Sequence, residues 1–210
     1  MHRLSPLEGA YANHLLQEGR RPASVHAFMH AQDQPERAFY EQYSSFSQLE
    51  QRLMQALFAE AAEVLQGAPE YADYGTRERL LGIFFTWMEV LTAHRSLVRL
   101  LYRHQKPGLL KEGILRALRP DFQAFAQEVL RAGNASGEVA DRWILPRWYA
   151  DVFWTQARLV FQFWLADRSA NFEQTDAIIE KSVNFLMDLI QPNALDSGVD
   201  LVRFFWQRRS

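Results

Sequence analysis

Helical periodicity, without a convincing alternating strand, is the feature that most limits what this chain can fold into. Glycine and proline interrupt the sequence at wide, irregular intervals, and the segments between them carry apolar residues at helical spacing. No internal repeat stands out. Because long helical segments joined by short links favour a bundle, the sequence predicts an all-α protein.

Capping residues predict where several helices begin and end. Ser5-Pro6-Leu7-Glu8 forms a capping box with proline at the first helical position, and Gly19 should close that helix. Ser45-Phe46-Ser47-Gln48 should begin a long helix that ends near Gly67-Ala68-Pro69. Farther along, we expect helices over 76–93, 139–166 and 172–190, with the clearest loop at 133–137.

Composition and motif searches argue against most enzyme and metal chemistry. There is no cysteine, so disulfide scaffolds, thiolate metal sites and cysteine nucleophiles are excluded. No phosphate-binding loop, dinucleotide turn or hydrolase motif occurs, so we expect neither an enzyme nor a cofactor. His26 and His30 have helical i,i+4 spacing but no third ligand nearby, so no metal site is expected. No secretory signal is visible in residues 1–19, and we expect a cytoplasmic protein.

A run of motifs near the N-terminus matches a known pattern without a gap. The matching positions are Gly19, Ser24-Val25, Phe28, Ala31, Phe39-Tyr40, Tyr43 and Ser45 to Leu49. This stretch resembles the DNA-binding region of the TetR family of bacterial regulators. Two positions depart from the family pattern: Asp33 stands where a turn glycine is usual, and Phe46 where a phosphate-contacting lysine is common.

The resemblance implies an all-α, TetR-like fold with two domains. Residues 1–48 would form a helix-turn-helix head, and residues 49–210 a ligand-binding and dimerisation domain. The implied function is a homodimeric transcriptional regulator that binds an operator through the head and an apolar effector through the second domain. The DNA-binding residues would be Arg20, Arg21, Ser24, Gln34, Arg37, Tyr40 and Tyr43.

The charge of the head leaves a second interpretation open. Residues 1–50 carry four basic and six acidic side chains, so their net charge is −2. Because phosphate contacts from lysine and arginine supply most nonspecific DNA affinity, a TetR-shaped head that no longer binds DNA is the alternative.

The C-terminal helices carry a second resemblance. Its positions are Asp167, Ser169, Phe172, Glu173, Thr175, Glu180, Val183 and Asn184. They are similar to the pattern of the TetR-fold, lipid-binding accessory proteins of ubiquinone biosynthesis. The alternative function is therefore a lipid- or isoprenoid-binding accessory protein that does not bind DNA.

The last predicted long helix has a broad apolar stripe. The TetR resemblance implies that this stripe forms a dimer interface, whereas the residues alone are equally compatible with packing inside one chain. The predicted interface residues are Ile179, Val183, Leu186 and Ile190. A tail at 199–209 combines aromatic residues with terminal arginines, which suits either peripheral membrane contact or docking over a groove.

Aromatic residues are concentrated on two predicted helices of the larger domain. They could line an apolar cavity with a few polar anchors, although aromatic stripes at helical spacing also form plain core. The predicted ligand-binding residues are Phe84, Trp87, Met88, His94, Arg95, Trp154, Arg158 and Phe161.

Overall fold

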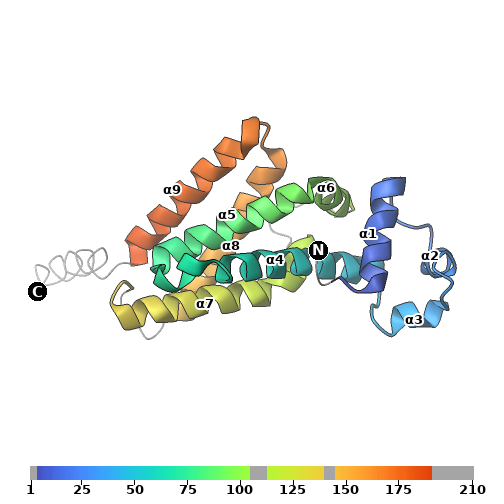
Figure 1. The fold of residues 1–210 in the computed structure, drawn as a ribbon, viewed down its shortest axis with the longest axis horizontal. Helices are drawn as coiled ribbons and strands as arrows, with labels where there is room; N and C mark the ends of the chain where they lie inside the picture. The colour runs from blue at the N-terminus through green and yellow to red at the C-terminus, as the bar shows by residue number, and fades with distance from the viewer. Residues whose placement is uncertain (1–3, 105–112, 140–144, 191–210) are drawn as a thin grey trace, which may run out of the picture. The chain divides into compact units, whose positions relative to one another are not determined.

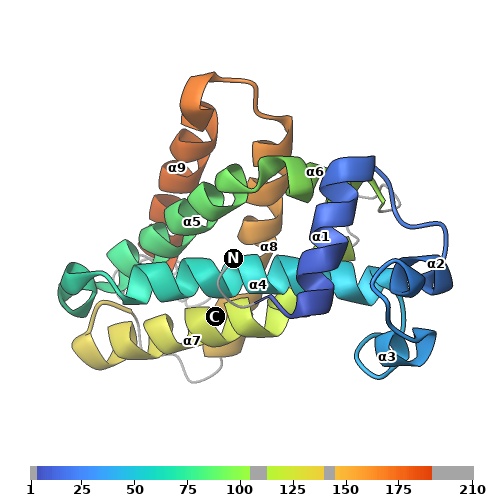
Figure 2. The ribbon, with the colours of Figure 1, turned by 45° about the vertical axis from the view of Figure 1, so that its right-hand side comes forward.

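The computed structural model describes residues 4–104, 113–139 and 145–190, and within these ranges the chain is helical, as predicted (Figures 1 and 2). Three short elements of 3-10 helix, η1 (Pro69–Asp73), η2 (Gly113–Leu118) and η3 (Ala170–Phe172), lie between α-helices. The α-helices are α1 (Pro6–Glu18), α2 (Val25–His30), α3 (Glu36–Tyr40), α4 (Phe46–Gln66), α5 (Thr76–Ala93), α6 (Arg95–Arg103), α7 (Arg119–Ser136), α8 (Leu145–Ala166) and α9 (Glu173–Ile190).

The predicted capping residues fix the ends of the first helix. The Ser5 hydroxyl accepts a hydrogen bond from the Glu8 amide, and the Glu8 carboxylate accepts one from the Ser5 amide, which completes the capping box. Gly19 closes α1 with a φ of 66°, a left-handed conformation that glycine adopts without the Cβ clash of other residues. The long helix that follows the head begins at Phe46 and ends at Gln66, as its flanking sequence predicts.

The loop predicted at residues 133–137 is wrong, because α7 continues through Ser136. Gly133 lies inside the helix, where a Cβ atom would come within 2.1 Å of the Thr76 hydroxyl oxygen. The absence of a side chain at Gly133 therefore allows close helix packing and does not form a turn. Asn134 and Ser136 stay helical, and the chain leaves the helix only at Gly137, which has a φ of 82°.

The chain divides into two compact units. The first comprises Met1–Val64 and Thr86–Asp121, and the second comprises Leu65–Phe85 and Phe122–Ser210. The first unit thus joins the three short N-terminal helices to parts of α4 and α5 and to α6, whereas the sequence predicted a boundary at residue 48.

The N-terminal helices pack around a cluster of aromatic rings. The ring of Phe46 lies 5.1 Å from Tyr11, 5.8 Å from Phe28 and 5.4 Å from Phe39, measured between centroids. Edge-to-face and stacked pairs at these distances stabilise a core beyond the effect of buried area. Phe46 therefore contributes apolar packing at the position where the resemblance placed a phosphate contact.

Candidate functional site

The N-terminal helices expose polar side chains on α3 and in the segments that precede it. Phe28, Met29 and Phe39 point inward and are buried. Arg20, Ser24, Gln34, Arg37 and Tyr40 are exposed. Five of the seven predicted DNA-binding residues are therefore accessible on the surface of the first unit.

The turn between α2 and α3 contains an unusual backbone conformation. Asp33 has a φ of 54°, which lies in the left-handed region that favours glycine. Aspartate is one of the few other residues found there, because its short polar side chain tolerates the conformation. The chain thus keeps the turn geometry at the position where the resembling family has glycine.

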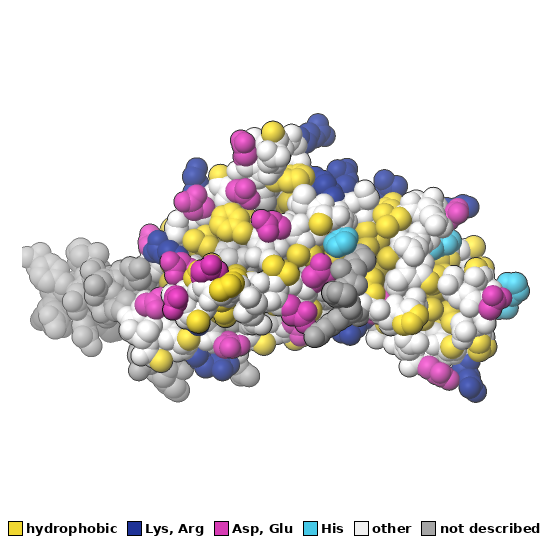
Figure 3. Space-filling model, viewed as in Figure 1, with side chains coloured by type: hydrophobic (Ala, Val, Ile, Leu, Met, Phe, Trp, Pro, Cys, Tyr) yellow, Lys and Arg dark blue, Asp and Glu magenta, His cyan; other side chains and the backbone are white. Residues whose placement is uncertain are grey.

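Two exposed basic side chains on this surface face carboxylates. Arg37 Nε lies 3.1 Å from Glu41 Oε1, and their side chains are 87% and 59% exposed. His26 Nδ1 lies 3.5 Å from Glu36 Oε2. On the face of α1–α3 shown in Figure 3, the described acidic and basic side chains are interspersed, without a continuous basic patch.

Arg21 forms an ion pair with a buried carboxylate. Arg21 Nε donates to Glu50 Oε1 at 2.8 Å, Nη2 donates to Oε2, and Glu50 is fully buried. The Tyr11 hydroxyl donates to Glu50 Oε1 at 2.8 Å, and His104 Nδ1 lies 3.1 Å from the same oxygen. We call these four residues the Glu50 cluster; it joins α1, the α1–α2 connection, α4 and the end of α6.

Two tyrosines of the head are held by carboxylates in the same manner. Burial, followed by the charge of Glu50, raises the pKa of Tyr11 far above its usual range. The Tyr43 hydroxyl donates to Glu8 Oε1 at 2.8 Å, and burial raises its pKa as well. Arg21 and Tyr43, both predicted to contact DNA, are thus bonded within the first unit.

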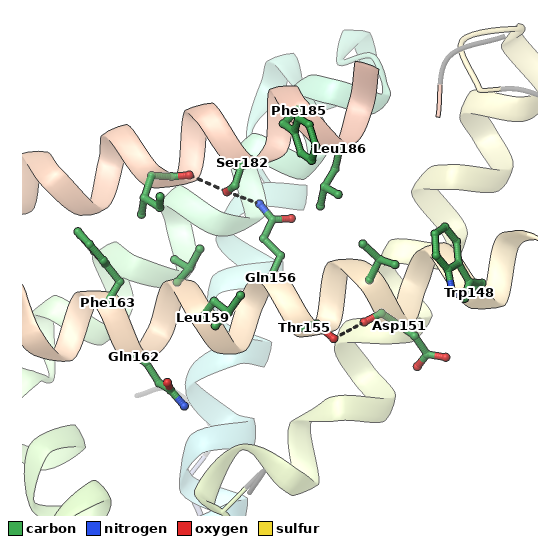
Figure 4. Close-up of a pocket in the computed structure, with 13 residues that line it drawn as sticks. Trp148, Asp151, Thr155, Gln156, Leu159, Gln162, Phe163, Ser182, Phe185 and Leu186 are labelled. Atoms are coloured by element: carbon green, nitrogen blue, oxygen red, sulfur yellow. Dashed lines mark hydrogen bonds between the residues drawn. The ribbon is translucent and has the colours of Figure 1, made fainter. Parts of the chain in front are cut away.

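A groove of about 780 Å³ runs along α8 and α9 in the second unit (Figure 4). Several large apolar side chains project from its walls into solvent. Asp151 is its one charged lining residue among the described side chains. The exposed apolar residues that line it are Trp148, Leu159, Phe163, Ile178 and Phe185.

The apolar residues of α9 fall on two sides of the helix. Ile179, Val183 and Ile190, three of the four predicted interface residues, are buried within the chain. Leu186, the fourth, lines the groove with Ile178 and Phe185. The broad stripe seen in the sequence therefore serves internal packing on one side and an uncovered surface on the other.

The predicted cavity residues belong to both units. Trp87, Met88, His94 and Arg95 lie in the first unit, and Phe84, Trp154, Arg158 and Phe161 in the second. The aromatic residues are buried, and in the second unit Phe122 contacts both Phe84 and Trp154 at ring distances of 5.8 and 5.6 Å. His94 and Arg95 line a separate cavity of about 410 Å³ beside α1.

The corner between α8 and α9 depends on Asp167. Its Oδ1 accepts from the backbone and hydroxyl of Ser169, at 2.8 and 2.7 Å. Its Oδ2 accepts from the backbone and hydroxyl of Thr175, at 2.9 and 2.6 Å. Burial alone would raise the pKa of Asp167, but these hydrogen bonds outweigh it and lower the pKa to about 2. Three residues of the second sequence pattern thus build this corner.

Comparison with known proteins identifies the fold. A family profile for the tetracyclin repressor-like C-terminal domain matches residues 79–205, which is more than half of the chain. The chain belongs to the TetR family. No curated protein is similar enough in sequence to count as a relative of this TetR-family protein.

Two solved structures share the fold of this TetR-family protein. One, from Shewanella sp. PV-4, is assigned to the TetR-family transcription regulators; it has 13% identity and a TM-score of 0.57, with 88% of this chain and 95% of that chain covered. The other is a protein of unknown function from Rhodococcus sp. RHA1, with 16% identity and a TM-score of 0.56, covering 90% of this chain and 97% of that chain.

Three other predictions for the TetR-family protein concern its C-terminal tail, membrane contact and metal binding. The tail at 199–209 lies outside the described residues. None of the described helices is long and apolar enough to cross a membrane. Within the described residues, histidine and carboxylate side chains do not gather in groups of three or more that could hold a metal ion.

Sequence reasoning missed the Glu50 cluster and most of the groove. The seven-residue spacing of Ile178 and Phe185 places them on one face of α9, and this signal was available within the broad stripe. Glu50 had no comparable signal, because its partners Tyr11, Arg21 and His104 are distant in sequence.

Replacement of Asp167 by asparagine should lower the free energy of unfolding at pH 7 by about 2 kcal/mol. The folded-state pKa of about 2 lies below the ordinary value of 3.8, so the carboxylate stabilises the fold above pH 4. That contribution is lost as the pH falls from about 4 to 2, so the free energies of unfolding of the wild type and of Asp167→Asn should then converge. Urea unfolding at pH 7 and pH 2 measures both differences.

The neighbouring Asp176 provides a control for this prediction. Burial, and then the charges of Asp167 and Glu173, raise its pKa. Asp176→Asn should therefore not destabilise the protein at pH 7. An Asp167→Asn variant as stable as Asp176→Asn would contradict the role given to the corner.

Proposed function

We propose that the protein is a cytoplasmic, homodimeric transcriptional regulator that binds an operator through α2 and α3 and dimerises through the groove of α8 and α9. The observation that carries the proposal is the exposed surface of α3 and of the turn before it, with Gln34, Arg37 and Tyr40 exposed over a buried aromatic core. Membership of the TetR family supports it, because helix-turn-helix proteins present such a helix to the major groove.

The interspersed charges of the head do not prevent DNA binding in this proposal. The Arg37–Glu41 pair is highly exposed, and such pairs contribute under about 1 kcal/mol. A guanine, which accepts two hydrogen bonds from an arginine, can therefore displace the carboxylate. Gln34 is proposed to pair with adenine, and Arg20, Ser24 and Tyr40 are proposed phosphate contacts.

Arg21 and Tyr43 have a different part in the proposal. Both are bonded to carboxylates, so they are proposed to hold the head together rather than to contact phosphates. With few phosphate contacts per protomer, the logarithm of the binding constant should fall with the logarithm of salt concentration with a slope of only about −2 to −4.

The groove supports dimerisation because large apolar side chains are exposed along two adjacent helices. Trp148 and Phe163 lie fifteen residues apart on α8, which corresponds to about 22 Å along the helix. A surface of this extent, with one charged side chain among its described lining residues, suits a helix pair from a second copy. The effector is proposed to be apolar; in the second unit it would have to separate rings that are now in contact.

Selection from a pool of random duplex DNA tests the function. The wild-type protein should enrich a two-fold symmetric sequence at low salt, and Arg37→Ala should weaken binding by about 1–3 kcal/mol and relax the preference at one base pair of each half-site. Glu41→Ala is the matched control, since it removes the competing carboxylate and should leave binding intact or stronger. Failure to enrich any sequence would contradict DNA binding.

A further inference from the structure

One amide lies buried in the middle of the apolar groove. Gln156 is 6% exposed, and its Nε2 donates to the Ser182 hydroxyl at 2.7 Å (Figure 4). Ser182 in turn donates to the Ile178 carbonyl at 2.6 Å. Because the only hydroxyl hydrogen of Ser182 is used in this way, Ser182 must accept from Gln156, which fixes the orientation of the amide.

This orientation leaves one polar atom without a partner. Gln156 Oε1 is buried and accepts no hydrogen bond within the described part of the chain. A buried, unpaired carbonyl destabilises a protein by about 1–3 kcal/mol, whereas an apolar residue of similar shape would carry no such cost. A small movement of the side chain would bring Oε1 to the surface of the groove, so the amide is expected to gain a donor when the groove is covered.

The position of Gln156 indicates which donor that is. It lies eight residues after Trp148 and seven before Phe163, so it is close to the centre of the groove along α8. In a two-fold symmetric interface, a residue at the centre meets the same residue of the other copy. Ser182 uses one N–H of the amide, which leaves one donor and one acceptor on each copy.

We infer that Gln156 lies on the two-fold axis of the homodimer and sets its register, with each amide donating its second N–H to Oε1 of the other. The inference rests on the homodimer proposed above. A shift of the helices would leave both amides unpaired among apolar side chains, so the pair favours a single alignment, as single polar residues do in apolar helix interfaces.

Opposite charges placed at this one position test the inference. Gln156→Glu alone and Gln156→Lys alone should each raise the dimer dissociation constant at least 100-fold, because like charges would face each other across the axis. An equal mixture of the two variants should recover dimers with an affinity within about tenfold of wild type. Sedimentation velocity measures all three samples, and circular dichroism establishes that each variant is folded.

Gln162 offers a matched control, being the same residue type on the same groove. It lies six residues from Gln156, or about 9 Å along α8, so its two copies would be about 18 Å apart. That separation exceeds the screening length of roughly 8–10 Å. Mixing Gln162→Glu with Gln162→Lys should therefore give no recovery beyond either variant alone.

A second measurement applies if the charged variants do not fold. The chain has no cysteine, so Gln162→Cys introduces a single site for a spin label. The distance between labels should be narrowly distributed with Gln156 present and broadened in Gln156→Met. If the wild type is dimeric but the mixed Gln156→Glu and Gln156→Lys variants do not recover dimers, the role of Gln156 is overturned while the homodimer stands. Label distances that stay unchanged in Gln156→Met would have the same meaning. A monomeric wild type would instead contradict the homodimer itself.

Discussion

Replacement of Glu50 by alanine is expected to lower the free energy of unfolding by about 3–5 kcal/mol. Glu50 is fully buried and is bonded to Tyr11, Arg21 and His104. Removal of its carboxylate leaves the half-buried Arg21 guanidinium without its carboxylate partner and leaves the buried Tyr11 hydroxyl without its acceptor. Urea denaturation followed by circular dichroism measures the loss.

Glu41→Ala is the control for Glu50, because it also removes a glutamate paired with an arginine. That pair is exposed, so its removal should cost under about 1 kcal/mol. Equal effects of Glu41→Ala and Glu50→Ala would mean that the Glu50 cluster does not stabilise the first unit. Glu50→Gln should fall between the two, because it keeps one acceptor and loses the charge.

Replacement of Phe185 by glutamate should convert the proposed dimer to monomers, with at least a 100-fold rise in the dissociation constant. Phe185 is 62% exposed in the single chain, so a charge there should leave the fold intact but would be buried and unpaired in the dimer. Operator affinity should fall with it, since a single head would contact only one half-site. Sedimentation and DNA titration measure the two effects.

Lys181→Glu is the control for Phe185, because it also introduces an acidic side chain on α9 at an exposed position outside the groove lining. It should leave both the dimer and DNA binding unchanged. Ile179→Glu is a poorer test, since Ile179 is fully buried and a charge there would disrupt the fold itself. A Phe185→Glu variant that remains dimeric would place the interface elsewhere.

Local signals predicted the helical framework well. The capping box at Ser5, the glycine at position 19 and the proline at position 69 act through residues close in sequence, so their effect can be recognised without the fold. Gly133 misled the prediction because its small size serves a contact with Thr76 on another helix. Helix packing of this kind leaves no local pattern.

The candidate site was less predictable for the same reason. Arg21 has the charge and position of a phosphate contact, and only the fold brings the Glu50 carboxylate to it. The stripe on α9 identified apolar residues but could not separate the side that includes Ile179 from the side that includes Phe185. Periodicity gives the width of an apolar face, whereas the packing of the neighbouring helices decides how much of it remains uncovered.

The uncovered apolar face of α8 and α9 has a consequence for how long each chain survives. If the face is closed by a second copy, resistance to unfolding rises with protein concentration by mass action. Newly made or scarce chains would expose Trp148, Leu159 and Phe185 to proteases and chaperones. The lifetime of the protein would then increase with its own abundance, so synthesis below the dimerisation threshold would be followed by rapid turnover.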